Sequence, residues 1–333
     1  MKKILIIQTA FIGDVVLATA LVEKIALFHP DATIDFLVRK GNETLLLNNP
    51  HLSEVFVWNK KKNKFKSLSE LLKKIRLANY DKVINVQRFF SSGLLTAFSG
   101  AKETIGFDKN PLSFLFSKKI KHLFDLSNPR HEVEKNNDLI AHFTDYNSIR
   151  PALYPSALDI EFIEPYIKNA FITITPSSVW FTKEYPKEKW IEFIHQLPAK
   201  YAVYLLGGKE NMEACKTIID KSNNKNIVTL AGKLSFLQSA ALMKFAAMNY
   251  TNDSAPLHFA SAVNASITAV FCSTLPAFGY TPLSDQSFIV QTKEVLSCRP
   301  CGIHGRKKCP EKHFNCAYTI ETSSLLNTLN GMQ

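Results

Sequence analysis

Short apolar runs alternate with longer helical patterns along the chain, and the alternation predicts strands that are each followed by a helix. The chain opens on a short apolar run, then a polar turn with Gly13 and Asp14, then an apolar-rich helix that extends to about Phe28. The first half continues with strands expected over 34–38, 55–58 and 82–86 and a helix over 68–77. These elements indicate a doubly wound α/β domain.

The second half of the chain shows the same alternation. Prolines at 151, 155 and 165 mark the expected crossing of the chain from the first half to the second. A buried strand is expected over 171–175, and another over 201–206 ends at two glycines. The helix between these strands is predicted from apolar residues at helical spacing, which are Trp190, Ile191, Phe193, Ile194 and Leu197. A second α/β domain is therefore expected.

Length and composition agree with two soluble domains. Domains average roughly 150 residues, so a chain of 333 residues is expected to form two. The 46% of hydrophobic residues are enough to fill two cores. We place the domains at 1–155 and 165–333. No apolar run approaches the ~18 residues of a spanning helix. Lys2, Lys3 and the apolar run after them resemble a signal peptide, but Asp14 interrupts that run. We therefore expect a cytoplasmic protein.

The turn over residues 250–260 combines an acidic residue, a helix start and an imidazole. A strand is expected to end near Asn252, Ser254 is expected to cap the next helix, and Pro256 suits the first helical turn. Backbone N–H groups and the positive end of the helix dipole then favour a phosphate or a sugar hydroxyl. The alternative is an ordinary capped helix in which His258 is half-buried.

Four short motifs occur in order along nearly the whole chain. They are Ile12-Gly13-Asp14, His131-Glu132-Val133-Glu134, Lys183-Glu184-Tyr185-Pro186, and Asn252-Asp253-Ser254 followed by His258 and Ala260. With these motifs the sequence resembles the lipopolysaccharide heptosyltransferases of glycosyltransferase family nine. The resemblance implies the GT-B architecture, in which two Rossmann-like domains face each other across a cleft. It also implies an inverting enzyme that moves heptose from ADP-heptose to an inner-core lipopolysaccharide acceptor.

Glycosyl transfer needs a base near the acceptor hydroxyl and positive charge near the leaving diphosphate. Asp14 matches the aspartate to which the family assigns the base, although an aspartate there also suits a cap of a helix that begins near Val15. Lys183 resembles the family's phosphate-binding lysine, and the resemblance implies that it stabilises the leaving group without any metal. A solvated surface lysine is its alternative interpretation.

Further residues are expected to bind the donor. They are Ser177, Ser178 and Thr182 in the loop after the strand 171–175, together with Asp253, Ser254, Ala255 and His258. The backbone amides of Ser254 and Ala255 are expected to face phosphate, and Asp253 or His258 to face sugar or ribose hydroxyls. The chain departs from the common family pattern, which has glycine at position 255 and a glycine-proline turn where Cys272-Ser273-Thr274 stands. The methyl group of Ala255 narrows the approach of a ligand.

The acceptor side is expected to use polar residues at the end of the strand 82–86 and at the edge of the domain. The candidates are Gln87, Arg88, Ser91 and His131, each of which also has a structural interpretation. The net charge of +11 includes two clusters, Lys60, Lys61, Lys62, Lys64 and Lys66, and Lys118, Lys119, Lys121 and Arg130. A polybasic segment gains roughly 1 kcal/mol per cation at an anionic membrane surface. We expect an anionic, lipid-linked saccharide acceptor and peripheral contact with the cytoplasmic face of the inner membrane, with solvated loops as the alternative.

Four of the six cysteines lie in one segment, 298–316, with the spacing Cys298-x2-Cys301-x7-Cys309-x6-Cys316. The C-x-x-C half has metal-ligand spacing, whereas the second half is irregular for a zinc ribbon. A structural zinc would take Cys298 and Cys301 with two of Cys309, His313 and Cys316. Reduced thiols or a disulfide pair are the alternative. Cys215 and Cys272 are isolated and expected to be buried.

Other functions are weighed against the transferase. The chain lacks both a G-x-G-x-x-G fingerprint and a Walker A loop, which disfavours a dehydrogenase or a P-loop ATPase. Within the same architecture, a transferase or an epimerase that uses another nucleotide sugar is the alternative. From another class, a basic zinc-knuckle protein would bind nucleic acid, but no aromatic binding motif or recognisable module supports it.

Overall fold

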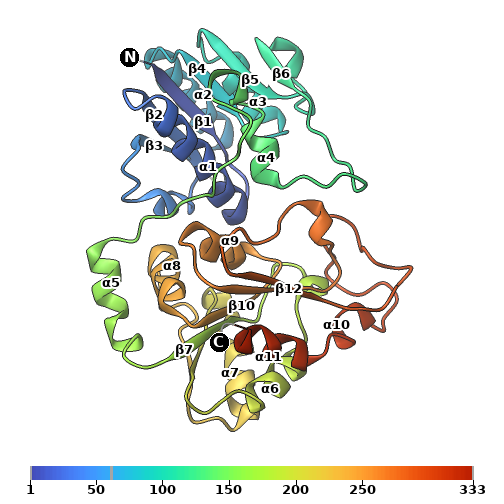
Figure 1. Ribbon diagram of the computed structural model, residues 1–333. Coiled ribbons are helices and arrows are strands. Elements are labelled where there is room, and N and C mark those ends of the chain that lie inside the picture. The colour runs from blue at the N-terminus through green and yellow to red at the C-terminus, as the bar shows by residue number, and fades with distance from the viewer. Residues whose placement is uncertain (1, 61–62, 332–333) are drawn as a thin grey trace. The chain divides into compact units, whose positions relative to one another are not determined.

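The computed structural model describes residues 2–60 and 63–331 and divides into two compact units, Met1–Tyr154 and Pro155–Gln333 (Figure 1). Each unit contains one six-stranded sheet in which neighbouring strands are parallel. The strand order is β3-β2-β1-β4-β5-β6 in the first unit and β12-β11-β10-β7-β8-β9 in the second. Read from β9, the second order repeats the first. The prediction of doubly wound α/β sheets is therefore confirmed.

The first unit contains the elements expected from the apolar runs, with shifted ends. Its strands are β1 (Lys3–Ile7), β2 (Thr33–Arg39), β3 (Leu52–Trp58), β4 (Lys82–Asn85), β5 (Glu103–Phe107) and β6 (Lys118–Ile120). Its α-helices are α1 (Ile12–Phe28), α2 (Lys64–Leu77), α3 (Phe90–Ala97) and α4 (Glu132–Asn137). The helix expected over 68–77 begins earlier, because Asn63 adopts a left-handed conformation directly before Lys64.

Helices cover both faces of the first sheet. Apolar side chains of α2 and α3 pack on β1 to β4 in one core around Trp58 and Tyr80, whose hydroxyl donates to Asp35 Oδ2 at 2.5 Å. On the other face, α1 packs against α4. Helix α1 is buried along most of its length, and its buried Lys24 donates to Asp145 and to the Asn147 carbonyl. This burial explains why α1 has no polar face in the sequence.

The second unit repeats the architecture and adds C-terminal helices. Its strands are β7 (Phe171–Thr175), β8 (Ala202–Leu205), β9 (Ile227–Thr229), β10 (Met248–Asn252), β11 (Ile267–Phe271) and β12 (Ser287–Gln291). Its α-helices are α5 (Ala157–Ile163), α6 (Lys187–His195), α7 (Met212–Ser222), α8 (Phe236–Phe245), α9 (Ala255–Ala262), α10 (Asn315–Tyr318) and α11 (Thr322–Asn330). The strand expected over 201–206 is shorter by one residue at each end.

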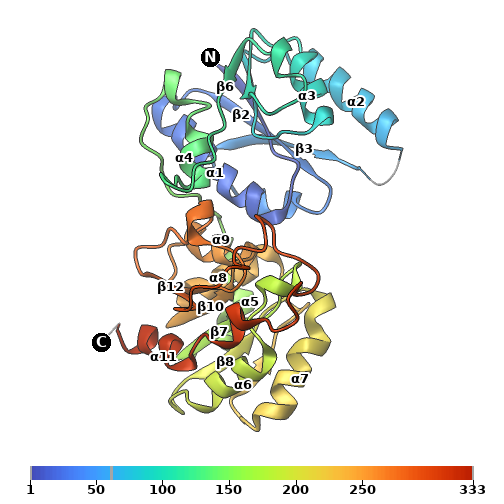
Figure 2. The same cartoon turned by 90° about the vertical axis from the view of Figure 1, so that its right-hand side faces the viewer.

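The core of the second unit lies between its sheet and the layer of α6, α7 and α11 (Figure 2). Its centre is aromatic: the rings of Tyr185 and Trp190 lie 5.0 Å apart, and those of Phe193 and Tyr250 lie 4.6 Å apart. Helices α5, α8 and α9 form a second packed group. The strands β7 and β11 are buried runs of apolar and threonine residues, as is typical of parallel strands covered on both faces, whereas the equally buried β10 includes Asn249 and Asn252.

Each sheet has one point at which the strand order reverses, between β1 and β4 in the first unit and between β7 and β10 in the second. The carboxyl ends of the strands at such a point diverge into loops on opposite faces and leave a ligand site between them. The loops after these four strands carry the candidate residues. Among the residues that the structure describes, no helix is both long and apolar enough to span a membrane.

Candidate functional site

At the reversal point of the first sheet, the strand ends are joined by a buried amide network. Gln87 follows β4, and its Oε1 accepts from the Thr9 hydroxyl at 2.8 Å while its Nε2 donates to Gln8 Oε1 at 2.6 Å. The side chain of Gln87 is buried. Gln87 therefore holds the ends of β1 and β4 together, and its contact with the acceptor stays a prediction.

Asp14 is the third residue of α1, at the carboxyl edge of the first sheet. The helix begins at Ile12 and not near Val15, and Asp14 Oδ2 accepts from the Phe11 N–H at 3.2 Å, which caps the helix from inside its first turn. Burial raises the pKa of Asp14 to about 6, and the Glu132 carboxylate adds to the rise. Asp14 thus caps the helix and also has the basicity of a proton acceptor near neutral pH.

Glu132 is the first residue of α4, and it is the nearby anion that raises the Asp14 pKa. Its carboxylate lies 3.4 Å from His122 Nε2 and 3.4 Å from Lys135 Nζ. Burial by itself would raise the pKa of Glu132, but the His122 hydrogen bond and the Lys135 charge hold it below its usual value. Glu132 therefore stays ionised beside Asp14. The sequence analysis included Glu132 in a motif but predicted no role for it.

The other residues expected on the acceptor side have different environments. His131 precedes α4 and caps it, since its Nδ1 accepts from the Val133 N–H at 3.1 Å. Arg88 is exposed, with its guanidinium over the Phe89 ring at 5.9 Å from the centroid. Ser91 is half-buried in α3. Acceptor contact by Arg88 and Ser91 stays a prediction.

The lysine clusters are not uniform solvated loops. Lys60 Nζ donates to the Thr9 carbonyl at 2.8 Å, so it lies at the carboxyl edge of the first sheet. Lys61 and Lys62 fall outside the described residues, while Lys66 is exposed on α2. In the second cluster, Arg130 forms two hydrogen bonds of 2.7 and 2.9 Å with Asp138, which neutralises much of its charge.

At the reversal point of the second sheet, the side chain of Asn252 fixes the loop that follows β7. Its Oδ1 accepts from the Tyr185 N–H at 2.9 Å, and its Nδ2 donates to the Pro176 carbonyl at 2.8 Å. Both ends of the loop 176–186 are thereby tied to the end of β10. The sequence placed Asn252 in a motif but assigned it no role.

Lys183 and Asp253 form an ion pair at this edge. Lys183 Nζ lies 2.7 Å from Asp253 Oδ2, and the two side chains are only 15% and 9% exposed. The Thr274 hydroxyl donates to the same Asp253 oxygen at 2.7 Å. The sequence named Lys183 and Asp253 separately, and it noted Thr274 only as part of an unusual turn. A lysine has three donors, so Lys183 is able to bond an anionic ligand as well as Asp253.

The hydroxyl residues of the loop 176–186 divide into two kinds. Thr182 is fully buried, and its hydroxyl accepts from Ser273 Oγ at 3.0 Å and from the Arg306 N–H at 2.7 Å. Thr182 therefore anchors the loop, and the structure does not support the expected donor contact. The Ser178 N–H donates to Glu184 at 2.8 Å, and Ser177 is half-buried. Donor contact by these two serines stays a prediction.

The start of α9 differs from the expected cap. Ser254 occupies the capping position, but its hydroxyl donates to the Asn252 carbonyl at 3.3 Å and caps no helical N–H. The prediction of a side-chain cap is therefore wrong, because the nearby carbonyl captures the hydroxyl. Helix α9 begins at Ala255 with Pro256 in its first turn, as expected. His258 is buried, with its ring 6.3 Å from that of Tyr280.

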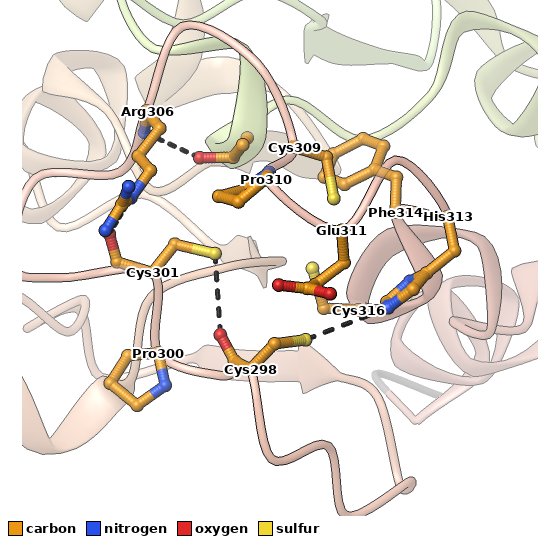
Figure 3. Close-up of a pocket in the computed structure, with 11 residues that line it drawn as sticks. Cys298, Pro300, Cys301, Arg306, Cys309, Pro310, Glu311, His313, Phe314 and Cys316 are labelled. Carbon is orange, nitrogen blue, oxygen red and sulfur yellow. Dashed lines mark hydrogen bonds between the residues drawn. The ribbon is translucent and has the colours of Figure 1, made fainter.

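The cysteine segment encloses a cavity of about 160 Å³ (Figure 3). Cys298, Cys301, Cys309 and Cys316 all line it and are all unpaired thiols. Burial raises the pKa of Cys316 to about 12, and the nearby thiols add to the rise. Within the described ranges, no group of three His, Cys, Asp or Glu side chains is already arranged to hold a metal ion. Cys215 and Cys272 are buried, as predicted.

Comparisons with known proteins agree with this architecture. The family model described as glycosyltransferase family 9 (heptosyltransferase) matches residues 68–314. Lipopolysaccharide heptosyltransferase 3 of Escherichia coli is 26% identical over 278 residues, which covers 79% of this chain and 82% of that protein. The structure of E. coli ADP-heptose LPS heptosyltransferase II superposes with a TM-score of 0.79 at 21% identity, covering 100% of this chain and 98% of the other. E. coli heptosyltransferase WaaC with ADP gives 0.75 at 16% identity, covering 99% and 100%. The chain therefore belongs to glycosyltransferase family 9, and it is a glycosyltransferase with the GT-B fold.

Proposed function

We propose that this chain is an inverting heptosyltransferase that moves heptose from ADP-heptose to an inner-core lipopolysaccharide acceptor. The family match and the names of its relatives support this reaction. The observation that carries the proposal is the Lys183–Asp253 ion pair at the reversal point of the second sheet, directly before the N-terminus of α9. A cation and a helix N-terminus at one sheet edge suit a nucleoside diphosphate.

On the acceptor side, Asp14 is the proposed general base. A bond forms between the acceptor oxygen and the anomeric carbon of the heptose, the bond from that carbon to the diphosphate breaks, and the hydroxyl proton moves to Asp14. A carboxyl with a pKa of about 6 is ionised at neutral pH and still basic enough to take this proton.

On the donor side, Lys183 stabilises the charge that develops on the departing ADP, so the transfer itself uses no metal ion. Backbone N–H groups of Ser254 and Ala255 face the diphosphate, and Asp253 or His258 faces ribose or sugar hydroxyls. Ser177 and Ser178 complete the donor side. The methyl group of Ala255 limits how close the diphosphate comes to the backbone.

The acceptor is an anionic, lipid-linked saccharide, reached at the cytoplasmic face of the inner membrane. Arg88 is exposed at the carboxyl edge of the first sheet, and Phe89 and Phe90 beside it are 53% and 57% exposed. An exposed cation next to exposed aromatic rings suits the interface of an anionic bilayer. Lys60 lies at the same sheet edge through its bond to Thr9.

Nucleotide specificity is tested by thermal shift. We expect ADP to raise the melting temperature in a concentration-dependent manner, because a ligand that binds only the folded state stabilises it by mass action, by about 2.7 kcal/mol at a hundredfold excess over Kd. UDP, GDP and a nucleic-acid oligomer serve as matched ligands. A rise in melting temperature with UDP or GDP but not with ADP would show that the donor carries a nucleotide other than ADP. A shift with the oligomer alone would support the nucleic-acid-binding alternative.

A further inference from the structure

A closed ring of contacts includes the Lys183–Asp253 ion pair. The Thr274 hydroxyl donates to Asp253 Oδ2 at 2.7 Å, and Lys183 Nζ lies 2.7 Å from the same oxygen. Elsewhere in the ring, the Ser273 hydroxyl donates to Thr182 Oγ1 at 3.0 Å. Ser273 directly precedes Thr274 in the chain, just as Thr182 precedes Lys183. These peptide links join the three polar contacts into a ring.

The ring is buried at its hydroxyl end and open at its ion-pair end. Ser273 and Thr182 are 0% exposed, and Thr274 is 1% exposed. Water therefore does not compete for these hydroxyl groups, and hydrogen bonds in such surroundings are stronger than at the surface. The side chains of Lys183 and Asp253 are 15% and 9% exposed. The ion pair is thus the part of the ring that a ligand reaches.

Ser273 joins the turn after β11 to two other segments. Its N–H donates to the Thr182 carbonyl at 3.2 Å, in addition to the contact between the two hydroxyls. The Ser273 carbonyl accepts from the Cys301 N–H at 3.0 Å. Arg299 holds the same turn, since its Nη2 donates to the Thr274 carbonyl at 2.8 Å. The position of Ser273 is therefore fixed by its backbone and by its side chain.

The hydroxyl of Ser273 is a feature of this sequence. The common family pattern has a glycine-proline turn where Cys272-Ser273-Thr274 stands, and neither glycine nor proline carries a side-chain hydroxyl. The contact between the Ser273 and Thr182 hydroxyls therefore depends on this departure from the pattern.

The ring fixes the Lys183 side chain at both ends. The two bonds from Ser273 hold Thr182, the residue directly before Lys183, and Asp253 holds the ammonium group. A lysine side chain is long and flexible, so fixing it before a ligand arrives reduces the entropy that binding loses. A charge that is already in place also stabilises a leaving group without reorganisation.

We propose that Ser273 is a positioning residue for the transfer, which acts by holding Lys183 at the place of the leaving diphosphate. The inference rests on the proposed function, because that function assigns the diphosphate to Lys183. Lys183 is the group that touches the donor, whereas the buried Ser273 acts through it. Thr274 closes the ring from the Asp253 side.

The first test is the affinity for ADP. Ser273→Ala should weaken ADP binding by roughly threefold to tenfold in calorimetry, the range expected for the loss of one hydrogen bond. Ser222→Ala is the matched control, since Ser222 is a buried serine of α7 whose hydroxyl donates to the Ile219 carbonyl at 3.0 Å. The control should leave the ADP affinity unchanged. Melting curves of both variants show that the fold is retained.

A double-mutant cycle separates positioning from a general loosening of the site. In the Lys183→Ala background, Ser273→Ala should change the ADP affinity by less than about twofold, because the group through which Ser273 acts is already absent. A merely structural role would weaken ADP binding by the same factor in both backgrounds, and that result overturns the inference.

A second variant keeps the test decisive if Ser273→Ala folds poorly. Thr274→Val preserves the shape of the side chain and removes the hydroxyl that donates to Asp253, so it opens the ring at another contact. It should also weaken ADP binding by roughly threefold to tenfold in the native background and by less than about twofold beside Lys183→Ala.

The possible failures are separate. Native ADP affinity in Ser273→Ala, or in Thr274→Val where that variant takes its place, overturns the positioning role and leaves the transferase proposal intact. A native chain that binds no ADP overturns the proposed donor, and the inference about Ser273 falls with it.

Discussion

Asp14→Asn is expected to lower the rate of transfer by about 10²–10⁴-fold, while the melting temperature and ADP affinity stay near those of the native chain. The loss corresponds to roughly 3–5 kcal/mol of barrier. Asparagine keeps an oxygen that accepts from the Phe11 N–H, so the cap at the start of α1 is preserved. Its amide is unable to take a proton, and a base acts in the transition state more than in substrate binding.

The control for capping is Asp159→Asn. Asp159 occupies the same third position in α5, where it accepts from the Ser156 N–H at 2.8 Å, and it has no proposed role in transfer. Rates are measured at saturating donor and acceptor beside melting curves for both variants. If Asp14→Asn transfers sugar within a fewfold of the native rate, Asp14 is only a helix cap.

The pH profile gives an independent readout of Asp14. The native rate should rise with pH and level off above an apparent pKa of about 6, because only the ionised carboxylate is a base. Since the folded pKa lies above the unfolded value of ~3.9, the contribution of Asp14 to stability falls as pH rises from about 4 to about 6. Glu132→Gln should shift the rise in rate to lower pH, because it removes a nearby negative charge that raises the pKa of Asp14.

Lys183→Ala is expected to weaken ADP binding by roughly 10–100-fold and to lower turnover further. A hydrogen bond to a charged group contributes about 1.5–3 kcal/mol, and 1.4 kcal/mol is tenfold in affinity. Calorimetry with ADP and steady-state rates provide the measurement. Lys187→Ala is the matched control, since Lys187 is exposed at the start of α6.

The ion pair requires a second variant, because Lys183→Ala leaves the buried Asp253 carboxylate without its cation. The double change Lys183→Ala with Asp253→Asn should recover melting temperature and still bind ADP weakly. Recovery of both stability and ADP affinity would show that Lys183 serves only to neutralise Asp253.

The fold was predictable because the pattern of apolar residues that forms each strand or helix lies within the sequence of that element. Parallel strands covered on both faces are rich in apolar and β-branched residues, so β7 was predictable from its own sequence. Element ends were less predictable, since they depend on single backbone conformations. Asn63 starts α2 early by adopting a left-handed conformation, and Phe11 lets α1 begin three residues before the expected Val15.

The sequence predicted which residues belong to the candidate site, but not which of them contact one another. Lys183 and Asp253 were both named, but their contact joins loops 70 residues apart in the chain and follows only from the strand order. Thr274 was noted only as part of an unusual turn and its partner was not predicted, because a threonine in a turn has many partners available to it. Ser254 looked like a cap, yet its hydroxyl bonds to the Asn252 carbonyl, and only the local geometry decides between these partners.

The most direct measurement is a transfer assay with the purified chain, an inner-core lipopolysaccharide acceptor and a panel of nucleotide sugars, read by mass spectrometry of the acceptor and by release of nucleotide. Our account predicts that ADP-heptose adds one heptose to the acceptor and releases ADP, and that UDP- and GDP-sugars leave the acceptor unchanged. Transfer of another sugar from one of those donors, with no heptose added from ADP-heptose, would contradict it.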